Sequence, residues 1–168
     1  LMLAQWLINE AIVDEVWFVV SPQNPFKRQD GLMDAERRLQ MRQEALEGNP
    51  HMKACDVELR LPTPSYTINT LRKLQEENPD KHFALLMGAD NVAGLPHWRE
   101  AEAIFQMVNI IVYPRDGITI EKFDSAHMQI VENAPRFDIS STQIRRWFSE
   151  GKDISPFIPK ACVRIMNE

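Results

Sequence analysis

The sequence has two cysteines, Cys55 and Cys162, and no apolar run as long as a membrane span. Because the cysteines stand far apart and form no Cys-x-x-Cys pair, a disulfide scaffold or a zinc ribbon is disfavoured. The first residues show no signal-peptide pattern, so neither export nor membrane insertion is expected. A reducing cytoplasm is therefore the expected compartment, with no membrane partner.

The sequence also lacks an excess of basic residues and the usual spacings of metal ligands. The chain has 19 Lys and Arg against 24 Asp and Glu, a net charge of −5. A dedicated nucleic-acid binder needs a basic field, so no nucleic-acid partner is expected, although a local basic cluster could still bind a small anion. The four histidines show no HxxxH spacing, and the GxSxG and GxxxxGK patterns are absent. We therefore expect no protein-bound metal, no nucleophile elbow and no P-loop.

The spacing of apolar residues predicts the secondary structure. It predicts helices over residues 1–11, 32–46, 68–74, 98–105 and 140–150, and a last helix from residue 159. It predicts strands over residues 16–20, 55–61, 82–87 and 108–113, with a further candidate strand over 128–131. The 55–61 strand is expected to be half exposed, and the continuous apolar runs at 16–20 and 82–87 are expected to be buried on both faces. Because strands alternate with helices, the sequence predicts one α/β domain, residues 1–168, with a parallel sheet covered on both faces.

The strongest local signal for chemistry is the segment Asp-Ile-Ser-Ser-Thr-Gln-Ile-Arg-Arg at residues 138–146. Hydroxyl groups stand at the start of a helix, where backbone N–H groups are free, and two arginines follow about one turn later. This combination suits a polyphosphate. From spacing alone, however, a capped surface helix with solvated arginines is the more frequent explanation.

Loops that follow the predicted strands carry the remaining candidates, because ligands of such sheets bind at the carboxyl ends of the strands. Each candidate also has a plainer explanation: a solvated loop, a helix cap, a turn or core packing. The candidate loop elements are Ser21–Arg28, Pro64-Ser65-Tyr66-Thr67, Gly88-Ala89-Asp90, Trp98 and Tyr113-Pro114-Arg115.

Taken together, these segments resemble the bacterial nicotinate-nucleotide adenylyltransferases of the nucleotidyltransferase superfamily. The matches occur in the family's order along essentially the whole chain, which makes several weak signals a strong joint one. They are Ser21-Pro22-x-x-Pro25-Phe26-Lys27, Arg38-Leu39-x-Met41, Pro64-Ser65-Tyr66-Thr67-x-x-Thr70-Leu71, Gly88-Ala89-Asp90, His97-Trp98, Tyr113-Pro114-Arg115 and Ile139-Ser140-Ser141-Thr142-x-Ile144-Arg145.

The resemblance implies a Rossmann-like nucleotidyltransferase fold and the joining of ATP to nicotinate mononucleotide, with Mg²⁺ carried on the ATP phosphates. It implies ATP contacts from Lys27, Ser140, Ser141, Thr142 and Arg145. It implies mononucleotide contacts from Tyr66, Thr67 and Trp98 at the nicotinate ring, Gly88 and Asp90 at a ribose, and Arg115 at an anion.

The sequence departs from the family at its beginning. The family opens with a strand and a G-x-F-x-P-x-H-x-G-H loop, and no such motif occurs here. Leu1 aligns just after the final histidine of that motif, so we expect further residues upstream, and no catalytic histidine is named.

Two alternatives stay open at this stage. One is a sister adenylyltransferase acting on nicotinamide mononucleotide or phosphopantetheine, for which Tyr66, Thr67 and Trp98 are the discriminating residues. The other is a nucleotide-binding module without catalysis. A homo-oligomer is compatible with either.

Overall fold

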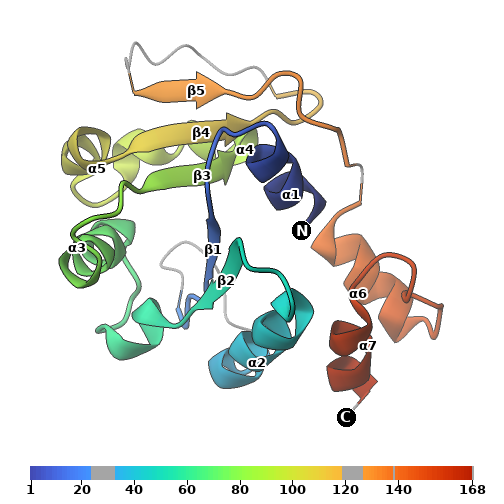
Figure 1. Ribbon diagram of the computed structural model, residues 1–168. Helices are drawn as coiled ribbons and strands as arrows, with labels where there is room; N and C mark the ends of the chain where they lie inside the picture. Colours follow the sequence, from blue (N-terminus) through green and yellow to red (C-terminus); the bar gives the residue numbers. More distant parts are fainter. Residues whose placement is uncertain (24–32, 119–126, 138, 168) are drawn as a thin grey trace. The chain divides into compact units, whose positions relative to one another are not determined.

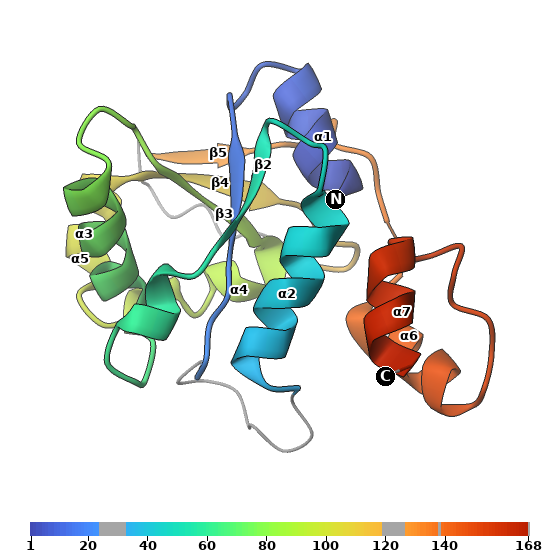
Figure 2. The same ribbon diagram turned by 60° about the horizontal axis from the view of Figure 1, so that its bottom comes forward.

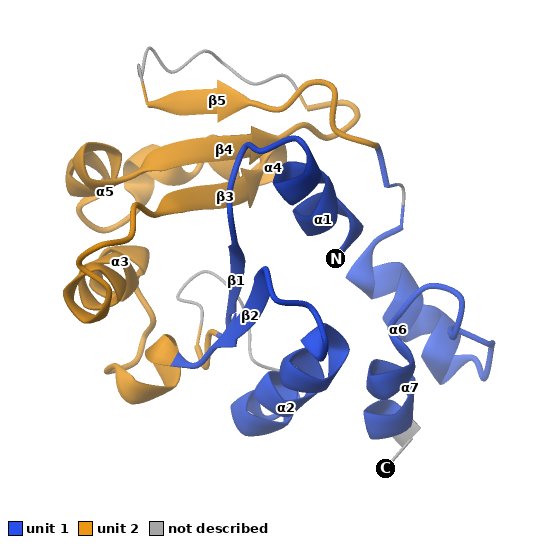
Figure 3. Cartoon of the chain, viewed as in Figure 1, with its two compact units in different colours: residues 1–20, 31–56, 136–168 blue, residues 21–30, 57–135 orange. Residues whose placement is uncertain are grey.

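The computed structural model describes residues 1–23, 33–118, 127–137 and 139–167 (Figure 1). The chain divides into two compact units (Figure 3). Unit 1 comprises residues 1–20, 31–56 and 136–168, and unit 2 comprises residues 21–30 and 57–135. Among the described helices, none combines the length and the apolar character that a membrane crossing requires.

Unit 1 contains a two-stranded parallel sheet of β1 (Val16–Val19) and β2 (Met52–Cys55). Figure 2 shows these strands with α1 (Met2–Asn9) and α2 (Ala35–Leu46). The helical spacing of apolar residues in α1 and the end of α2 directs them to one cluster with β2. Its buried members are Ala4, Leu46 and Met52.

The start of α2 is capped by the side chain of Asp34. One carboxylate oxygen of Asp34 accepts hydrogen bonds from the backbone N–H groups of Glu36 at 2.9 Å and Arg37 at 3.3 Å. These are two of the donors that a helix start leaves without an intrahelical partner. The helix ends where Glu47 leaves helical geometry with a ψ of 132°, and Gly48 then adopts a φ of +80°, a conformation that glycine reaches at little cost.

Unit 1 also contains α6 (Ser141–Ser149) and α7 (Lys160–Asn167). The last helix packs against α2. Arg37 donates a hydrogen bond of 2.7 Å to the backbone carbonyl of Ile165, and Arg164 forms an ion pair with Glu44. Ile165 is almost completely buried, as its place on the apolar stripe predicts.

Unit 2 contains a three-stranded parallel sheet in the order β3 (Ala84–Gly88), β4 (Asn109–Tyr113), β5 (Met128–Ile130). Successive side chains of a strand point to opposite faces, so alternate residues of the three strands share one face. That face forms one apolar cluster with the residues that follow β3. Its strand members are Leu85, Met87, Ile110, Val112, Met128 and Ile130.

Helices of unit 2 pack against these strands and against one another. They are η1 (Val57–Arg60), α3 (Thr67–Glu77), α4 (Ala89–Val92), η2 (Leu95–His97) and α5 (Ala101–Met107). A second buried cluster joins α3 to α5 through Ile68, Leu71, Ile104 and Val108. The parallel strands and the helices packed on them confirm the predicted α/β class.

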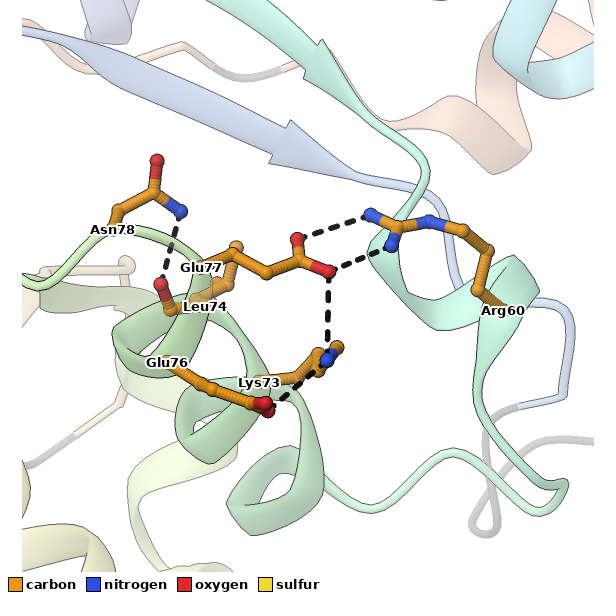
Figure 4. A network of polar contacts seen from close by, with 6 residues as sticks. All are labelled: Arg60, Lys73, Leu74, Glu76, Glu77 and Asn78. Carbon is orange, nitrogen blue, oxygen red and sulfur yellow. Dashed lines mark hydrogen bonds and ion pairs between the residues drawn. The ribbon is translucent and has the colours of Figure 1, made fainter.

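The C-terminal half of α3 is tied to η1 by charged side chains (Figure 4). Arg60 donates to both carboxylate oxygens of Glu77, at 2.7 and 3.1 Å. Nζ of Lys73 lies 3.0 Å from Oε2 of Glu76 and 3.7 Å from Oε1 of Glu77. Asn78 ends the helix by donating to the carbonyl of Leu74 at 2.9 Å. The ion pairs are solvent-accessible, so each is expected to contribute little to stability.

The strand predicted over residues 55–61 is wrong. The strand ends at Cys55, and Val57–Arg60 forms a 3₁₀ turn instead. The alternation of apolar and polar residues suggested a half-exposed strand, but Val57 and Glu58 are both buried although they are adjacent. Two neighbouring buried side chains do not fit a strand with one exposed face. Glu58 is buried because it has a hydrogen-bonding partner, which the pattern does not reveal.

Other boundaries also differ from the expectation. The residues of β1 are only half buried, not buried on both faces. In β3, only Met87 is fully buried. The turn expected at residues 88–90 is the start of α4. The helix expected from residue 98 begins at Ala101, because Glu100 adopts a left-handed φ of +53°.

Candidate functional site

The carboxyl ends of β3 and β4 bring together an acidic and a basic side chain. Gly88 is paired with Tyr113 in the parallel register, so residues two positions beyond each of them leave the sheet side by side. These residues are Asp90 and Arg115, whose Oδ1 and Nε atoms lie 3.3 Å apart. Both side chains are about half exposed, so the ion pair is accessible to a ligand and is expected to contribute little to stability.

Glycine at position 88 makes this arrangement possible. A Cβ atom on residue 88 would lie 2.3 Å from Oδ1 of Asp90 and 3.2 Å from Nε of Arg115. A separation of 2.3 Å is far below van der Waals contact, so any side chain would displace the carboxylate. The missing Cβ therefore lets the Asp90 carboxylate lie directly against the end of β3.

A second group of predicted residues lies at the start of α3. Tyr66 is the N-cap, in extended conformation, and Thr67 is the first helical residue. The Tyr66 side chain makes no capping hydrogen bond. Instead, its ring packs against the cluster that joins α3 to α5. This gives the aromatic ring a position beside the positive end of the helix dipole, a location that favours anions.

A buried pair of polar residues, Thr70 and Glu58, lies next to this helix start. Thr70 donates a hydrogen bond of 2.7 Å from its hydroxyl to Oε1 of Glu58, and the two residues are 5% and 8% exposed. The same hydroxyl lies 3.4 Å from the carbonyl oxygen of Tyr66. Within the described residues, Oε2 of Glu58 and the buried hydroxyl oxygen of Ser65 have no hydrogen-bond partner. Sequence reasoning missed Glu58 because it placed this residue in a strand.

Trp98 lies between the two apolar clusters of unit 2. Its half-buried indole packs against both the cluster on the sheet face and the cluster that joins α3 to α5. Core packing, the plainer explanation of this residue, is therefore part of its role. Because the indole is not fully buried, part of it remains available to a planar ligand.

The residue that follows Trp98 was not among the predicted site residues. The guanidinium carbon of Arg99 lies 4.8 Å from the centroid of the Tyr66 ring, within the range of a cation–π contact. The only signal in the sequence was its position next to Trp98, and adjacency alone does not give a side-chain direction.

The predicted phosphate-binding segment forms the start of α6 in unit 1. Ser140 is the N-cap and accepts a hydrogen bond of 3.1 Å from the backbone N–H of Gln143, which confirms the cap. The exposed hydroxyl groups of Ser141 and Thr142 follow in the first turn. Arg145 lies one turn further and is 3.4 Å from the Thr142 hydroxyl oxygen.

The two arginines of α6 differ in their partners. Arg146 forms an ion pair of 2.7 Å with Glu150, whereas Arg145 forms no ion pair with a carboxylate of the described residues. Arg145 is therefore the arginine that remains available to a phosphate group. Lys27, the other basic candidate, lies outside the described residues.

Over residues 1–23, 33–118, 127–137 and 139–167, no three His, Cys, Asp or Glu side chains gather as a metal site. Asp90, the one acidic candidate at the strand ends, is paired with Arg115.

Comparisons with known proteins agree in both sequence and fold. The family described as cytidylyltransferase-like matches residues 1–147. A protein of Bacteroides fragilis named "Probable nicotinate-nucleotide adenylyltransferase" is 43% identical over 169 residues, covering all of this chain and 84% of that protein. A protein of Flavobacterium johnsoniae with the same name is 42% identical, covering 95% of this chain and 83% of that protein.

Solved structures give the fold. The nicotinic acid mononucleotide adenylyltransferase of Plasmodium falciparum, solved in complex with NaAD, superposes with a TM-score of 0.76 at 18% identity, over 99% of this chain and 86% of that one. The structure titled as a putative nicotinate-nucleotide adenylyltransferase of Vibrio parahaemolyticus superposes with a TM-score of 0.69 at 22% identity, over 98% and 90%. The predicted nucleotidyltransferase fold is thus confirmed.

Proposed function

This chain belongs to the nicotinate-nucleotide adenylyltransferases, enzymes of NAD biosynthesis, and we propose how its residues divide the work of joining ATP to nicotinate mononucleotide. The observation that carries the function is the identity of 43% over the whole chain to a relative of that name. The products are nicotinate adenine dinucleotide and pyrophosphate. The roles of individual residues below are inferences from their positions and chemistry.

The start of α3 is proposed to bind the nicotinate ring. Tyr66 and Trp98 offer aromatic surface, and Thr67 offers a hydroxyl at the positive end of the helix. A ring carboxylate is stabilised by free N–H groups and by the helix dipole. Exclusion of water by the two aromatic side chains would strengthen those hydrogen bonds.

The ends of β3 and β4 are proposed to bind the mononucleotide's ribose and an anionic group. Gly88 allows close approach to the backbone, and the Asp90 carboxylate can accept hydrogen bonds from ribose hydroxyls. Arg115 can turn from Asp90 to an anion at small cost, because the ion pair between them is half exposed. These two side chains therefore exchange a mutual contact for contacts with substrate.

The start of α6 is proposed to bind the ATP phosphates. Ser140, Ser141 and Thr142 supply hydroxyl groups beside the first N–H groups of a nine-residue helix. Arg145 supplies the positive charge. Lys27 is proposed to reach the phosphates as well, a role inferred from the sequence motif alone.

The chemistry requires positioning and charge neutralisation rather than a protein nucleophile. A 5′-phosphate oxygen of nicotinate mononucleotide attacks the α-phosphorus of ATP in line. A new oxygen–phosphorus bond forms, the bond between the α-phosphorus and its bridging oxygen breaks, and pyrophosphate leaves with the electron pair. Donors held in place where negative charge gathers accelerate this step. We propose that Mg²⁺ enters with ATP, bound to its phosphates.

The setting of the reaction is also a proposal. Cys55 and Cys162 are both free thiols, which suits a reducing compartment such as the cytoplasm. A single domain over residues 1–168 and assembly into a homo-oligomer stay predictions from the sequence.

The two arginines of α6 provide a matched test of the ATP site. Arg145→Ala should lower kcat/KM for ATP by about 30-fold, since a lost charge-assisted contact costs roughly 2 kcal/mol. Arg146→Ala removes the same charge one position later but breaks only the ion pair with Glu150, so it should change kcat/KM by less than about threefold. Steady-state kinetics of protein made from the complete coding region would measure both. Equal effects of the two substitutions would remove Arg145 from the ATP site.

A further inference from the structure

We propose that the guanidinium of Arg99 selects the acid form of the substrate by binding the ring carboxylate of nicotinate mononucleotide. This inference rests on the proposed function and adds a specificity-determining side chain to its nicotinate site. The observation behind it is the position of Arg99 over the ring of Tyr66, 4.8 Å from its centroid.

The residue next to Arg99 is paired with a different arginine. The next residue, Glu100, adopts a left-handed backbone conformation and accepts two hydrogen bonds from Arg72 of α3, at 3.2 and 2.6 Å. This hydrogen bonding by Arg72 is the main reason why the pKa of Glu100 is lowered, with the nearby charge of Arg99 a smaller cause. Arg72 thus occupies both carboxylate oxygens of Glu100, and the Arg99 guanidinium lies over the Tyr66 ring.

The charge of Arg99 remains available for a ligand. Arg99 is exposed and forms no ion pair with any carboxylate of the described residues. A cation–π contact uses the face of the guanidinium, whereas its five N–H donors lie in its plane. A carboxylate can therefore accept two parallel hydrogen bonds from the edge of Arg99 while the face stays on Tyr66.

The carboxylate is the group that fits this position. Tyr66 caps α3, so the Arg99 guanidinium is held at a helix start whose dipole also favours negative charge. Nicotinate mononucleotide carries a carboxylate on its ring, whereas nicotinamide mononucleotide carries a neutral amide that presents N–H groups to the same donors. The two compounds share the ribose and the 5′-phosphate, so a residue that binds the carboxylate should affect kcat/KM for only one of them.

Selectivity between the two mononucleotides tests this assignment. With protein made from the complete coding region, Arg99→Gln should lower kcat/KM for nicotinate mononucleotide by about 10- to 30-fold, the range of a charge-assisted hydrogen bond at an accessible site. Its kcat/KM for nicotinamide mononucleotide should stay within about twofold, because the neutral ring loses no ionic contact. Arg99→Lys keeps the charge without the planar fork and should fall between wild type and Arg99→Gln.

Arg60→Gln is the matched control. It removes one exposed positive charge from the same unit, but Arg60 pairs with Glu77 (Figure 4). Glu77 is the last residue of α3, at the opposite end of the helix from its N-cap Tyr66. It should leave the ratio of the two kcat/KM values unchanged. An equal loss on both mononucleotides in Arg99→Gln, or no loss on either, would overturn the inference.

The proposed function and the role of Arg99 are contradicted by different results. If wild-type protein makes no nicotinate adenine dinucleotide, the proposed function is wrong. If wild type makes it and Arg99→Gln keeps the wild-type preference for the acid, only the role of Arg99 is wrong. Titration calorimetry with nicotinate mononucleotide in the absence of ATP gives a readout independent of turnover, and the Kd should rise about 10-fold in Arg99→Gln.

Discussion

The buried pair of Glu58 and Thr70 offers a sharp test of how the nicotinate site is supported. Thr70→Val replaces a hydroxyl by a methyl group of similar size. It removes the 2.7 Å hydrogen bond to Oε1 of Glu58, and Oε2 has no partner among the described residues. The substitution would therefore leave the whole carboxyl group of Glu58, which is 8% exposed, without a donor from the described chain.

The cost follows from that loss. Leaving a buried polar group without its partner costs about 1–3 kcal/mol, and more where the group is charged. For a protein of this size each kcal/mol corresponds to roughly 2–4 °C in Tm, so a loss of about 1–3 kcal/mol predicts a fall of about 2–12 °C. Since the Thr70 hydroxyl also lies near the Tyr66 carbonyl, the KM for nicotinate mononucleotide should rise while the KM for ATP stays the same.

Urea unfolding followed by circular dichroism gives the free energy of unfolding. Thr70→Ser keeps the hydroxyl and serves as the control, expected within about 1 kcal/mol of wild type. The double variant Glu58→Leu with Thr70→Val removes both polar partners and should recover much of the lost stability. A Thr70→Val protein as stable as Thr70→Ser would refute the claim that this hydrogen bond supports the start of α3.

Two further predictions concern the strand ends and the acid response. Gly88→Ala should lower kcat/KM at least about 10-fold through displacement of the Asp90 carboxylate, whereas Gly94→Ala should have no such effect, because its Cβ would approach no atom closer than 3.5 Å. Hydrogen bonding by Arg60 lowers the pKa of Glu77 in the folded protein. At acidic pH the unfolded state therefore binds more protons than the folded state, and the free energy of unfolding decreases as the pH falls through the lowered pKa. The fall in unfolding free energy below about pH 4.5 should be shallower in Arg60→Gln, and equal pH dependence of the two proteins would contradict this.

The sequence predicted the fold well where local signals and tertiary packing agree. Asp34 and Ser140 cap their helices as their residue types predict, and Gly48 follows the end of α2. The prediction was wrong at residues 55–61, where burial of Glu58 depends on Thr70, twelve residues later. No local pattern contains such a partnership.

In the candidate site, too, the sequence predicted some residues and missed others. The motifs named Asp90 and Arg115, but only the register of β3 with β4 explains why their side chains meet. Arg99 was missed because its importance comes from its contact with the ring of Tyr66, 33 residues earlier. A single sequence gives residue types in order, whereas the direction of an exposed arginine is set by neighbours that are distant along the chain.

The measurement that tests the central claim most directly is the comparison of kcat/KM for nicotinate and nicotinamide mononucleotide with wild-type protein, ATP and Mg²⁺, with products identified by mass spectrometry. Two donors at the start of α3 that an amide would leave mismatched, at about 1–3 kcal/mol each, predict nicotinate adenine dinucleotide as the product and a preference for the acid of roughly a hundredfold or more. Equal efficiency on the two mononucleotides, or a preference for the amide, would contradict the account.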